Sequence, residues 1–261
     1  MRLHTPFFRY GFHAATQTDT GRRRASNQDV AVSCPAEGFY AVSDGMGGLP
    51  CNGGGITSHM IGKVLPLIIR DAAALLDTEQ PVPEHAAELL EQHVRLLSDN
   101  IYDMGNSERH IFYGATLSGV WLVDRHAVFV NLGDSRGYYL PSRSKKISQV
   151  TADHNLAALL VDLGELSKAE AGSHPSSSQL LQFAGMPAPA KPDVYVCEVH
   201  PGDRLLVCSD GLYGMVDDAR LPRLMRSAKR NPDTVCRHLI GEANAGGGRD
   251  NISAVYLKIL K

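Results

Sequence analysis

The sequence predicts an α+β fold in which antiparallel sheets carry helices on their outer faces. Segments with strand character are many and short, and consecutive strands recur without a crossover helix between them. Two longer stretches show the apolar spacing of helices instead. Because successive strands of a doubly wound parallel sheet are joined by such crossovers, antiparallel pairing fits this order better.

The strand segments are runs of β-branched, aromatic or aliphatic residues bounded by turn residues. In chain order they are 29–33, 38–43, 115–123, 126–132, 137–140, 193–199, 203–208 and 252–260. Residues 120–130 predict a hairpin, because two apolar runs flank a short polar turn.

Two long helical segments, 55–77 and 84–104, have apolar residues spaced by three and four positions. Shorter helices are expected at 155–163, 218–228 and 232–244. Between them, residues 164–192 are rich in Gly, Ser, Ala and Pro, so we expect a flexible flap over the surface there. Neither an internal repeat nor a dividing linker is found, which predicts a single domain over 1–261.

Length and composition are those of an ordinary globular protein. The 261 residues are enough for a full core, with 43% hydrophobic and 21% charged residues. A formal charge of -2 gives no reason to expect attraction to nucleic acid or anionic membrane. Residues 1–12 lack the apolar run of a signal peptide, and no segment has the roughly 20 apolar residues of a membrane span. We therefore expect the cytoplasm.

The cysteines predict neither a disulfide framework nor a thiolate zinc site, because their number is odd and no Cys-x-x-Cys spacing occurs. Reduced thiols without a catalytic role are the simpler interpretation. The five are Cys34, Cys51, Cys197, Cys208 and Cys236.

Three aspartates beside apolar runs are the most informative feature for function. Asp44-Gly45 and Asp210-Gly211 each end such a run, and Asp250 precedes the run 252–260. Strands that are distant in sequence meet in a sheet, so carboxylates at their ends can converge on a hard cation. The glycine after Asp44 allows a main-chain carbonyl to face the same ion. A plain glycine-rich turn is the competing interpretation.

Two further residues could join such a cluster. Arg24 lies close to Asp29, and its planar guanidinium could grip two phosphate oxygens, although a surface ion pair is the competing interpretation. Asp134, in Gly-Asp-Ser-Arg, could reach the same cluster or simply serve a hairpin turn.

The segment Thr-Ala-Asp-His-Asn at 151–155 predicts the start of a helix. Asp153 or Asn155 could accept hydrogen bonds from backbone N–H groups there, and this capping role is favoured over catalysis by His154.

In their order along the chain, these motifs resemble the metal-dependent protein phosphatase family, the type 2C serine/threonine phosphatases, in its compact bacterial form. The similarity runs from about residue 21 to residue 260. It rests on Arg-x-x-Asn-Gln-Asp, Ser-Asp-Gly-Met-Gly-Gly, Gly-Ala-Thr, Gly-Asp-Ser-Arg, Thr-Ala-Asp-His, Ser-Asp-Gly-Leu and Arg-Asp-Asn. The resemblance implies a central β-sandwich of two antiparallel sheets with helices on both outer faces and a two-metal site at one end.

The resemblance also implies a set of metal ligands. Asp44 would bridge the two ions and the Gly45 carbonyl would hold one of them. Asp210 and Asp250 would complete the other. Oxygen-rich sites of this kind suit Mg²⁺ or Mn²⁺, and two such ions lower the pKa of a shared water that can attack phosphorus.

Other implied roles concern catalysis. Asp29 would act through metal-bound water, Arg24 would hold the substrate phosphate, and Asp134 with Asp210 would match a weaker third-metal position. Two positions depart from the family pattern: many eukaryotic members have His in place of Met46, and many members have Glu in place of Gln28. Because a thioether cannot donate a proton, the resemblance leaves the general acid unassigned.

The expected function is hydrolysis of phosphoserine and phosphothreonine in proteins by a metal-activated water, opposing a Ser/Thr kinase. One alternative is an inactive or weak regulator that binds phosphoproteins on the same scaffold. Another is a phosphatase of small phosphoesters. The expected partners are phosphorylated proteins and a cognate kinase, with no nucleic acid and no membrane.

Overall fold

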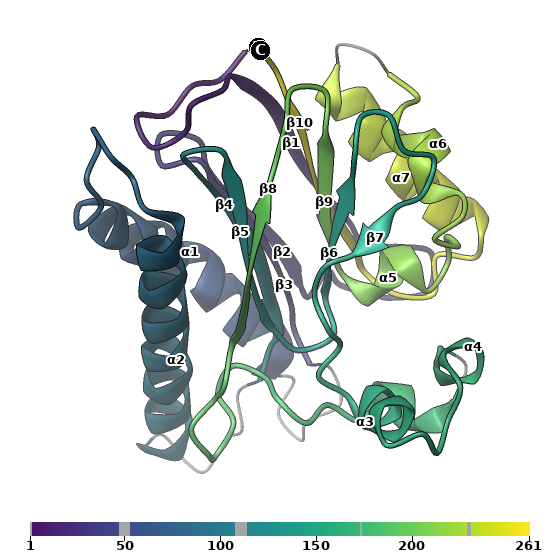
Figure 1. Ribbon diagram of the computed structural model, residues 1–261. Helices are drawn as coiled ribbons and strands as arrows, with labels where there is room; N and C mark the ends of the chain where they lie inside the picture. The colour runs from purple at the N-terminus through teal and green to yellow at the C-terminus, as the bar shows by residue number, and fades with distance from the viewer. Residues whose placement is uncertain (1, 47–52, 108–113, 173, 229–230) are drawn as a thin grey trace.

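Two antiparallel sheets packed face to face form the centre of the molecule, with helices on both outer faces (Figure 1). Figure 1 is drawn from a computed structural model, which describes residues 2–46, 53–107, 114–172, 174–228 and 231–261. This is the α-β-β-α sandwich that the resemblance implied.

The first sheet has the strand order β2-β3-β4-β5-β8, with antiparallel neighbours throughout. Its strands are β2 (Asp29–Cys34), β3 (Phe39–Asp44), β4 (Leu117–Val123), β5 (His126–Leu132) and β8 (Asp193–Glu198). The predicted hairpin is confirmed, because β4 and β5 pair from Val123 and His126 outward across a two-residue turn. Asp124 in that turn has φ of 49°, a conformation that aspartate tolerates better than most residues.

The second sheet has the order β1-β10-β9-β6-β7. Its strands are β1 (Phe12–Asp19), β10 (Ile252–Ile259), β9 (Arg204–Cys208), β6 (Arg136–Leu140) and β7 (Ser148–Gln149). The sequence did not predict β1 or β7. The β1 sequence Phe-His-Ala-Ala-Thr-Gln-Thr-Asp has few strand-forming residues, and its pairing with β10 along its whole length supplies what local propensity lacks.

Helices cover each sheet on its outer side (Figure 1). The first sheet is covered by α1 (Gly53–Ala73) and α2 (Pro83–Ser107), and α7 (Pro232–Ala245) packs on β1 and β10 of the second. Two shorter helices, α5 (Asp210–Tyr213) and α6 (Leu221–Met225), lie beside α7.

The segment 164–192, expected to be a flap, follows α3 (Leu156–Asp162) and contains two short helices, α4 (Lys168–Ala171) and η1 (Pro175–Ser178). In Figure 1, α3 and α4 project from one end of the sandwich. A capping box between Ser167 and Glu170 starts α4, which is local chemistry that compositional reasoning overlooked.

The hydrophobic core has three layers. Trp121, Ile61 and Leu90 belong to the layer between the first sheet and its helices. Phe12 and Tyr40 belong to the layer between the sheets, where their rings meet edge to face. The third layer lies between the second sheet and its helices. Each sheet is therefore packed on both of its faces.

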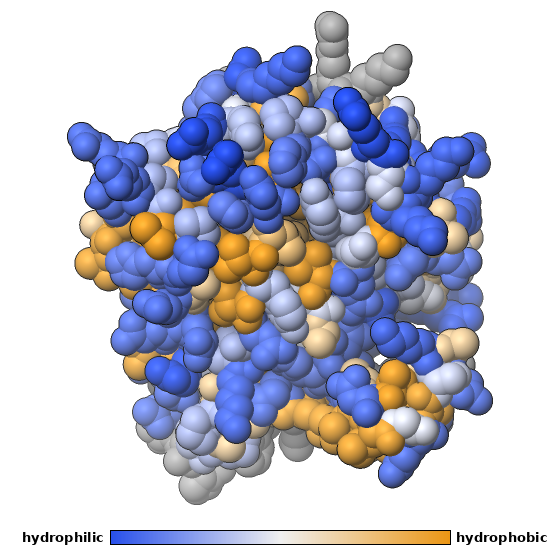
Figure 2. Space-filling view, in the orientation of Figure 1, coloured by the Kyte–Doolittle hydropathy of each residue, from blue (hydrophilic) through white to orange (hydrophobic). Residues whose placement is uncertain are grey.

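Figure 2 shows a mainly hydrophilic face with small apolar patches over β8 and α3, where Val196, Leu159 and Leu163 are exposed.

The four cysteines in the described ranges are free thiols, and Cys51 lies outside those ranges. Within the same ranges, no helix has both the length and the apolar character that a membrane crossing requires.

Candidate active site

The strand ends bring four of the predicted aspartates to one end of the sandwich. Asp29 begins β2 and Asp44 ends β3, and the two are directly paired across the strands. Asp210 follows β9 at the start of α5, and Asp250 lies just before β10. Since β9 and β10 are neighbours in the second sheet, both sheets contribute carboxylates to the same end.

A serine connects the two sheets at this point. The Oγ of Ser209 donates a hydrogen bond of 2.7 Å to Oδ2 of Asp29, and it accepts one of 2.9 Å from the N–H of Ser253. Asp29 is 2% exposed, so this bond fixes a buried carboxylate. Ser209 therefore orients Asp29 toward the strand ends of the opposite sheet.

The carboxyl groups are close enough to perturb one another. The pKa of Asp44 is raised well above its ordinary value, first by burial and then by the negative charges of Asp29 and Asp210. Burial, followed by the charges of Asp250 and Asp29, raises the pKa of Asp210 to about 6. Several carboxylates without cations are thus unfavourable here.

The residues fit hard divalent cations. Oδ1 of Asp29 and Oδ1 of Asp210 are buried, and neither accepts a hydrogen bond from the described residues. A cation would satisfy such oxygens and neutralise the crowded charges. Over the described ranges, however, no three acidic, histidine or cysteine side chains converge as a preformed cage. The strand ends therefore bring the aspartates to one region despite their mutual repulsion, but their oxygens do not surround one point.

Arg24 lies at the same site. Its Nη2 is 2.6 Å from Oδ2 of Asp250, and this hydrogen bond is the main cause that raises the pKa of Arg24. The Arg24 side chain is 49% exposed, so the guanidinium also faces solvent. Arg24 thus forms the ion pair of the competing interpretation, and its partner Asp250 is an aspartate of the predicted site.

Asn251, to which the sequence analysis gave no role, holds the Arg24 loop in place. It is 3% exposed, and its Oδ1 accepts a 2.8 Å hydrogen bond from the N–H of Gln28. Its Nδ2 donates to the carbonyls of Thr20 and Ser26, each at 2.9 Å. Asn251 therefore joins the loop before β2 to the start of β10. The signal in the sequence was the amide directly after Asp250.

The Gly-Ala-Thr motif acts on the backbone of Asp44. Oγ1 of Thr116 accepts a 3.1 Å hydrogen bond from the N–H of Asp44 and shares one of 2.7 Å with Oγ of Ser135. The N–H of Thr116 in turn donates to the Asp44 carbonyl at 2.8 Å. Thr116 thus fixes the end of β3 and links it to the Gly-Asp-Ser-Arg turn.

The residues after Asp44 are described only in part. The N–H of Gly45 donates to the carbonyl of Gln28 at 3.1 Å, and that of Met46 donates to the carbonyl of Gly114 at 3.0 Å. Gly47 and Gly48, which complete the predicted glycine-rich turn, lie outside the described residues.

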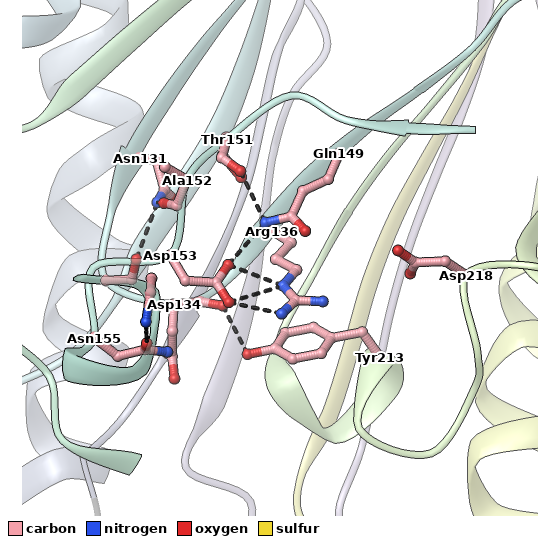
Figure 3. A network of polar contacts seen from close by, with 12 residues as sticks. Asn131, Asp134, Arg136, Gln149, Thr151, Ala152, Asp153, Asn155, Tyr213 and Asp218 are labelled. Atoms are coloured by element: carbon pink, nitrogen blue, oxygen red, sulfur yellow. Dashed lines mark hydrogen bonds and ion pairs between the residues drawn. The ribbon is translucent and has the colours of Figure 1, made fainter. Parts of the chain in front are cut away.

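Arg136 is the centre of a polar network around Asp134 (Figure 3). Its guanidinium donates to Asp153 through Nε at 2.9 Å and Nη2 at 2.7 Å, and its Cζ stacks 3.7 Å from the ring centre of Tyr213. The Tyr213 hydroxyl donates to the backbone carbonyl of Asp134 at 2.9 Å. Burial, followed by the negative charges of Asp210 and Asp153, raises the pKa of Asp134 to about 8.

The polar residues of the segment 151–155 have different structural roles. Asn155 caps α3, since its Oδ1 accepts a hydrogen bond from the N–H three residues on, as predicted. Asp153 does not cap, because it pairs with the arginine of the network. His154 lies 3.1 Å from Asp193 through Nε2 and accepts from the N–H of Gly133 through Nδ1. It therefore supports the turn that carries Asp134.

Comparisons with known proteins identify this arrangement. The model of the protein phosphatase 2C family matches residues 17–235, and the chain belongs to that family. A serine/threonine phosphatase stp from Listeria innocua is 32% identical over 250 residues, which cover 94% of this chain and 95% of that protein.

Solved structures agree with this assignment. The serine/threonine phosphatase of S. agalactiae has a TM-score of 0.80 and 28% identity, covering 96% of this chain and 100% of its own. The catalytic domain of the phosphatase PstP, solved with two manganese ions, has a TM-score of 0.76 and 26% identity, covering 96% and 99%.

Proposed function

We propose that the protein is a metal-dependent phosphatase that hydrolyses phosphoserine and phosphothreonine in proteins. The observation that carries the proposal is the gathering of Asp29, Asp44, Asp210 and Asp250 at one end of the sandwich, where the buried Oδ1 atoms of Asp29 and Asp210 have no hydrogen-bond partner among the described residues. Membership of the protein phosphatase 2C family and similarity to named serine/threonine phosphatases support the same reaction.

Two Mn²⁺ or Mg²⁺ ions would be held by Asp44, the Gly45 carbonyl, Asp210 and Asp250, with Asp134 and Asp210 offering a weaker third position. The two manganese ions of the PstP catalytic domain support this number. All of these donors are hard oxygen ligands, which suit Mg²⁺ and Mn²⁺ rather than softer metals.

The side chains divide the remaining work. When bound, the two ions lower the pKa of a water molecule so that it can attack phosphorus. The Oγ of Ser209 orients Asp29, and this carboxylate would act through the water that the ions activate. Arg24 binds phosphate oxygens through its exposed guanidinium edge and stabilises the charge that spreads over them in the transition state.

The proposed hydrolysis needs no thiol nucleophile, and the four described cysteines do not provide one. Burial raises the pKa of Cys34 to about 12, and burial also raises the pKa values of Cys197, Cys208 and Cys236. These four cysteines are therefore neutral thiols at physiological pH, with little of the thiolate that attacks phosphorus.

Chelation should separate this mechanism from a thiol mechanism. Treatment with EDTA should abolish release of phosphate from a phosphothreonine peptide, and Mn²⁺ or Mg²⁺ should restore it. Blocking of thiols with iodoacetamide should leave the rate largely unchanged. Full activity in metal-free protein would rule out the proposed mechanism.

Stability should depend on pH in the metal-free protein. Because the folded-state pKa values of Asp210, about 6, and Asp134, about 8, lie above the ordinary 3.8, their stabilising contribution is complete at low pH. It is lost as the pH rises through these values. The urea midpoint in EDTA should therefore be higher at pH 6 than at pH 8.

Two comparisons test this origin of the pH dependence. Saturating Mg²⁺ should reduce the difference between the two midpoints, because the ions stabilise the charged carboxylates. Asp134→Asn should also reduce it, whereas an equal difference in that variant would assign the effect to other groups.

The alternatives are tested by substrates. A phosphoprotein-binding regulator would bind a phosphopeptide without releasing phosphate. A phosphatase of small phosphoesters would show a higher kcat/KM for free phosphoserine than for the phosphopeptide. We further propose that the chain acts as one domain in the cytoplasm, on phosphorylated proteins and opposite a Ser/Thr kinase, with no nucleic acid or membrane as partner.

A further inference from the structure

We propose that three arginines beside the active site select phosphoproteins with acidic side chains next to the phosphorylated residue. We call Arg22, Arg23 and Arg249 the basic rim. This inference rests on the proposed function and adds a class of substrate to it.

The basic rim lies on two loops that touch each other. The N–H of Arg22 donates to the carbonyl of Gly248 at 2.7 Å. A Cβ on Gly248 would lie 2.8 Å from Cγ of Arg22, so the two loops are in direct contact. Gly21 is closer still to the second loop, since a Cβ there would lie 2.1 Å from the carbonyl oxygen of Asp250.

Two residues of the rim are next in sequence to the two members of the ion pair that marks the phosphate position. Arg23 directly precedes Arg24, and Arg249 directly precedes Asp250. Arg24 and Asp250 are joined at 2.6 Å. Consecutive Cα atoms lie about 3.8 Å apart, so a peptide bound with its phosphate at Arg24 has its neighbouring residues within reach of the rim.

The charges of the rim are not neutralised by the described protein. All three side chains are exposed, and none has an ion-pair partner within the described ranges. By contrast, the exposed Arg9 and Arg220 pair with Asp124 and Glu242.

The acidic group on the strand leading to the rim is already engaged. Oδ1 of Asp19 accepts hydrogen bonds from the N–H of Gly21 at 2.8 Å and from Nδ2 of Asn244 at 3.0 Å. Its carboxylate thus fixes the turn and is not paired with an arginine of the rim. Three positive charges therefore remain available to a ligand.

Carboxylates are the complementary groups on a protein substrate. Guanidinium groups donate in a planar fork that matches a carboxylate, and exposed pairs of this kind affect recognition more at low salt. Acidic residues near a phosphoserine or phosphothreonine would meet the rim, whereas lysines there would be repelled.

The test uses phosphothreonine peptides that are identical except for the three residues on each side of the phosphothreonine. These are all Asp, all Ala or all Lys, in separate sets for the two sides. With Mn²⁺ at low salt, kcat/KM should rank Asp above Ala above Lys for at least one side, by about three- to tenfold per step. The ranking should weaken in 0.5 M salt, a condition that screens exposed charges.

Substitution of the rim should remove this preference. The triple variant R22A/R23A/R249A should hydrolyse the three peptides at similar rates. The matched control R95A/R143A/R237A loses the same charge from α2, the loop after β6 and α7, and should keep the wild-type ranking. Thermal unfolding checks that both variants fold. If the triple variant does not fold, the single variant Arg23→Ala replaces it in the test and should lose part of the preference.

Hydrolysis of p-nitrophenyl phosphate separates the two proposals. If the wild type hydrolyses neither this ester nor any peptide, the proposed function fails. If it hydrolyses the ester and the peptides without preference, only the basic rim is overturned. The basic-rim proposal is also overturned if the rim variant keeps the preference for acidic peptides, or if the control variant loses it.

Discussion

Asp44→Asn should lower kcat/KM for a phosphothreonine peptide by about a hundredfold to a thousandfold, the range seen when one group that stabilises transition-state charge is removed. The reason is its central position: it is paired with Asp29 across the strands, and the negative charge of Asp210 acts on it as well. An amide keeps the shape of the side chain, but it lacks the charge that draws in divalent cations.

The same substitution should not destabilise the metal-free fold. In that state burial and neighbouring carboxylates raise the pKa of Asp44, so its negative charge is unfavourable and its removal is neutral or stabilising. Steady-state kinetics in saturating Mn²⁺ and urea unfolding in EDTA measure the two effects. Asp71→Asn, on the exposed surface of α1, is the matched control and should change neither. Wild-type turnover in the Asp44 variant would remove this residue from the site.

Arg136→Leu should destabilise the protein by about 3–5 kcal/mol, the range for breaking one side of a buried ion pair. The side chains of Arg136 and Asp153 are only 18% and 11% exposed, and two nitrogens of the guanidinium bind the carboxylate. Leucine would leave Asp153 without its cation and would remove the partner stacked on Tyr213. Urea denaturation of the metal-free protein measures this loss.

Two further variants control for this effect. Arg9→Leu breaks an ion pair whose arginine is 65% exposed, and it should cost less than about 1 kcal/mol. The double variant Arg136→Leu with Asp153→Leu should recover part of the stability, because no unpaired charge then remains. If Arg136→Leu costs no more than Arg9→Leu, the network contributes little to the fold.

Elements with a strong local signal were predictable from the sequence. The β4–β5 hairpin and the two long helices follow from apolar periodicity, and Asp44, Asp210 and Asp250 follow from their positions beside apolar runs. Strand β1 was not predictable in this way, because its stability comes from β10, more than two hundred residues away in sequence.

Supporting residues were harder to predict than the charged ones. Asn251 makes three hydrogen bonds to the Arg24 loop, but an amide carries no pattern that says which backbone groups it will meet. Asp153 could equally cap a helix or pair with an arginine, and only the three-dimensional position of Arg136 decides between them. The sequence therefore indicates which groups are candidates for the chemistry, whereas their orientation depends on tertiary contacts.

The division of the aspartates between the two sheets also bears on cohesion of the sandwich. Asp29 and Asp44 belong to one sheet, whereas Asp210 and Asp250 are at strand ends of the other. An ion bound by aspartates of both sheets would link the two sheets to each other. At a concentration one hundred times its Kd, it would add about 2.7 kcal/mol to the free energy of unfolding. Loss of divalent ions would then lower the stability of the folded protein as well as stop catalysis. The supply of these ions would thereby also affect the lifetime of the protein.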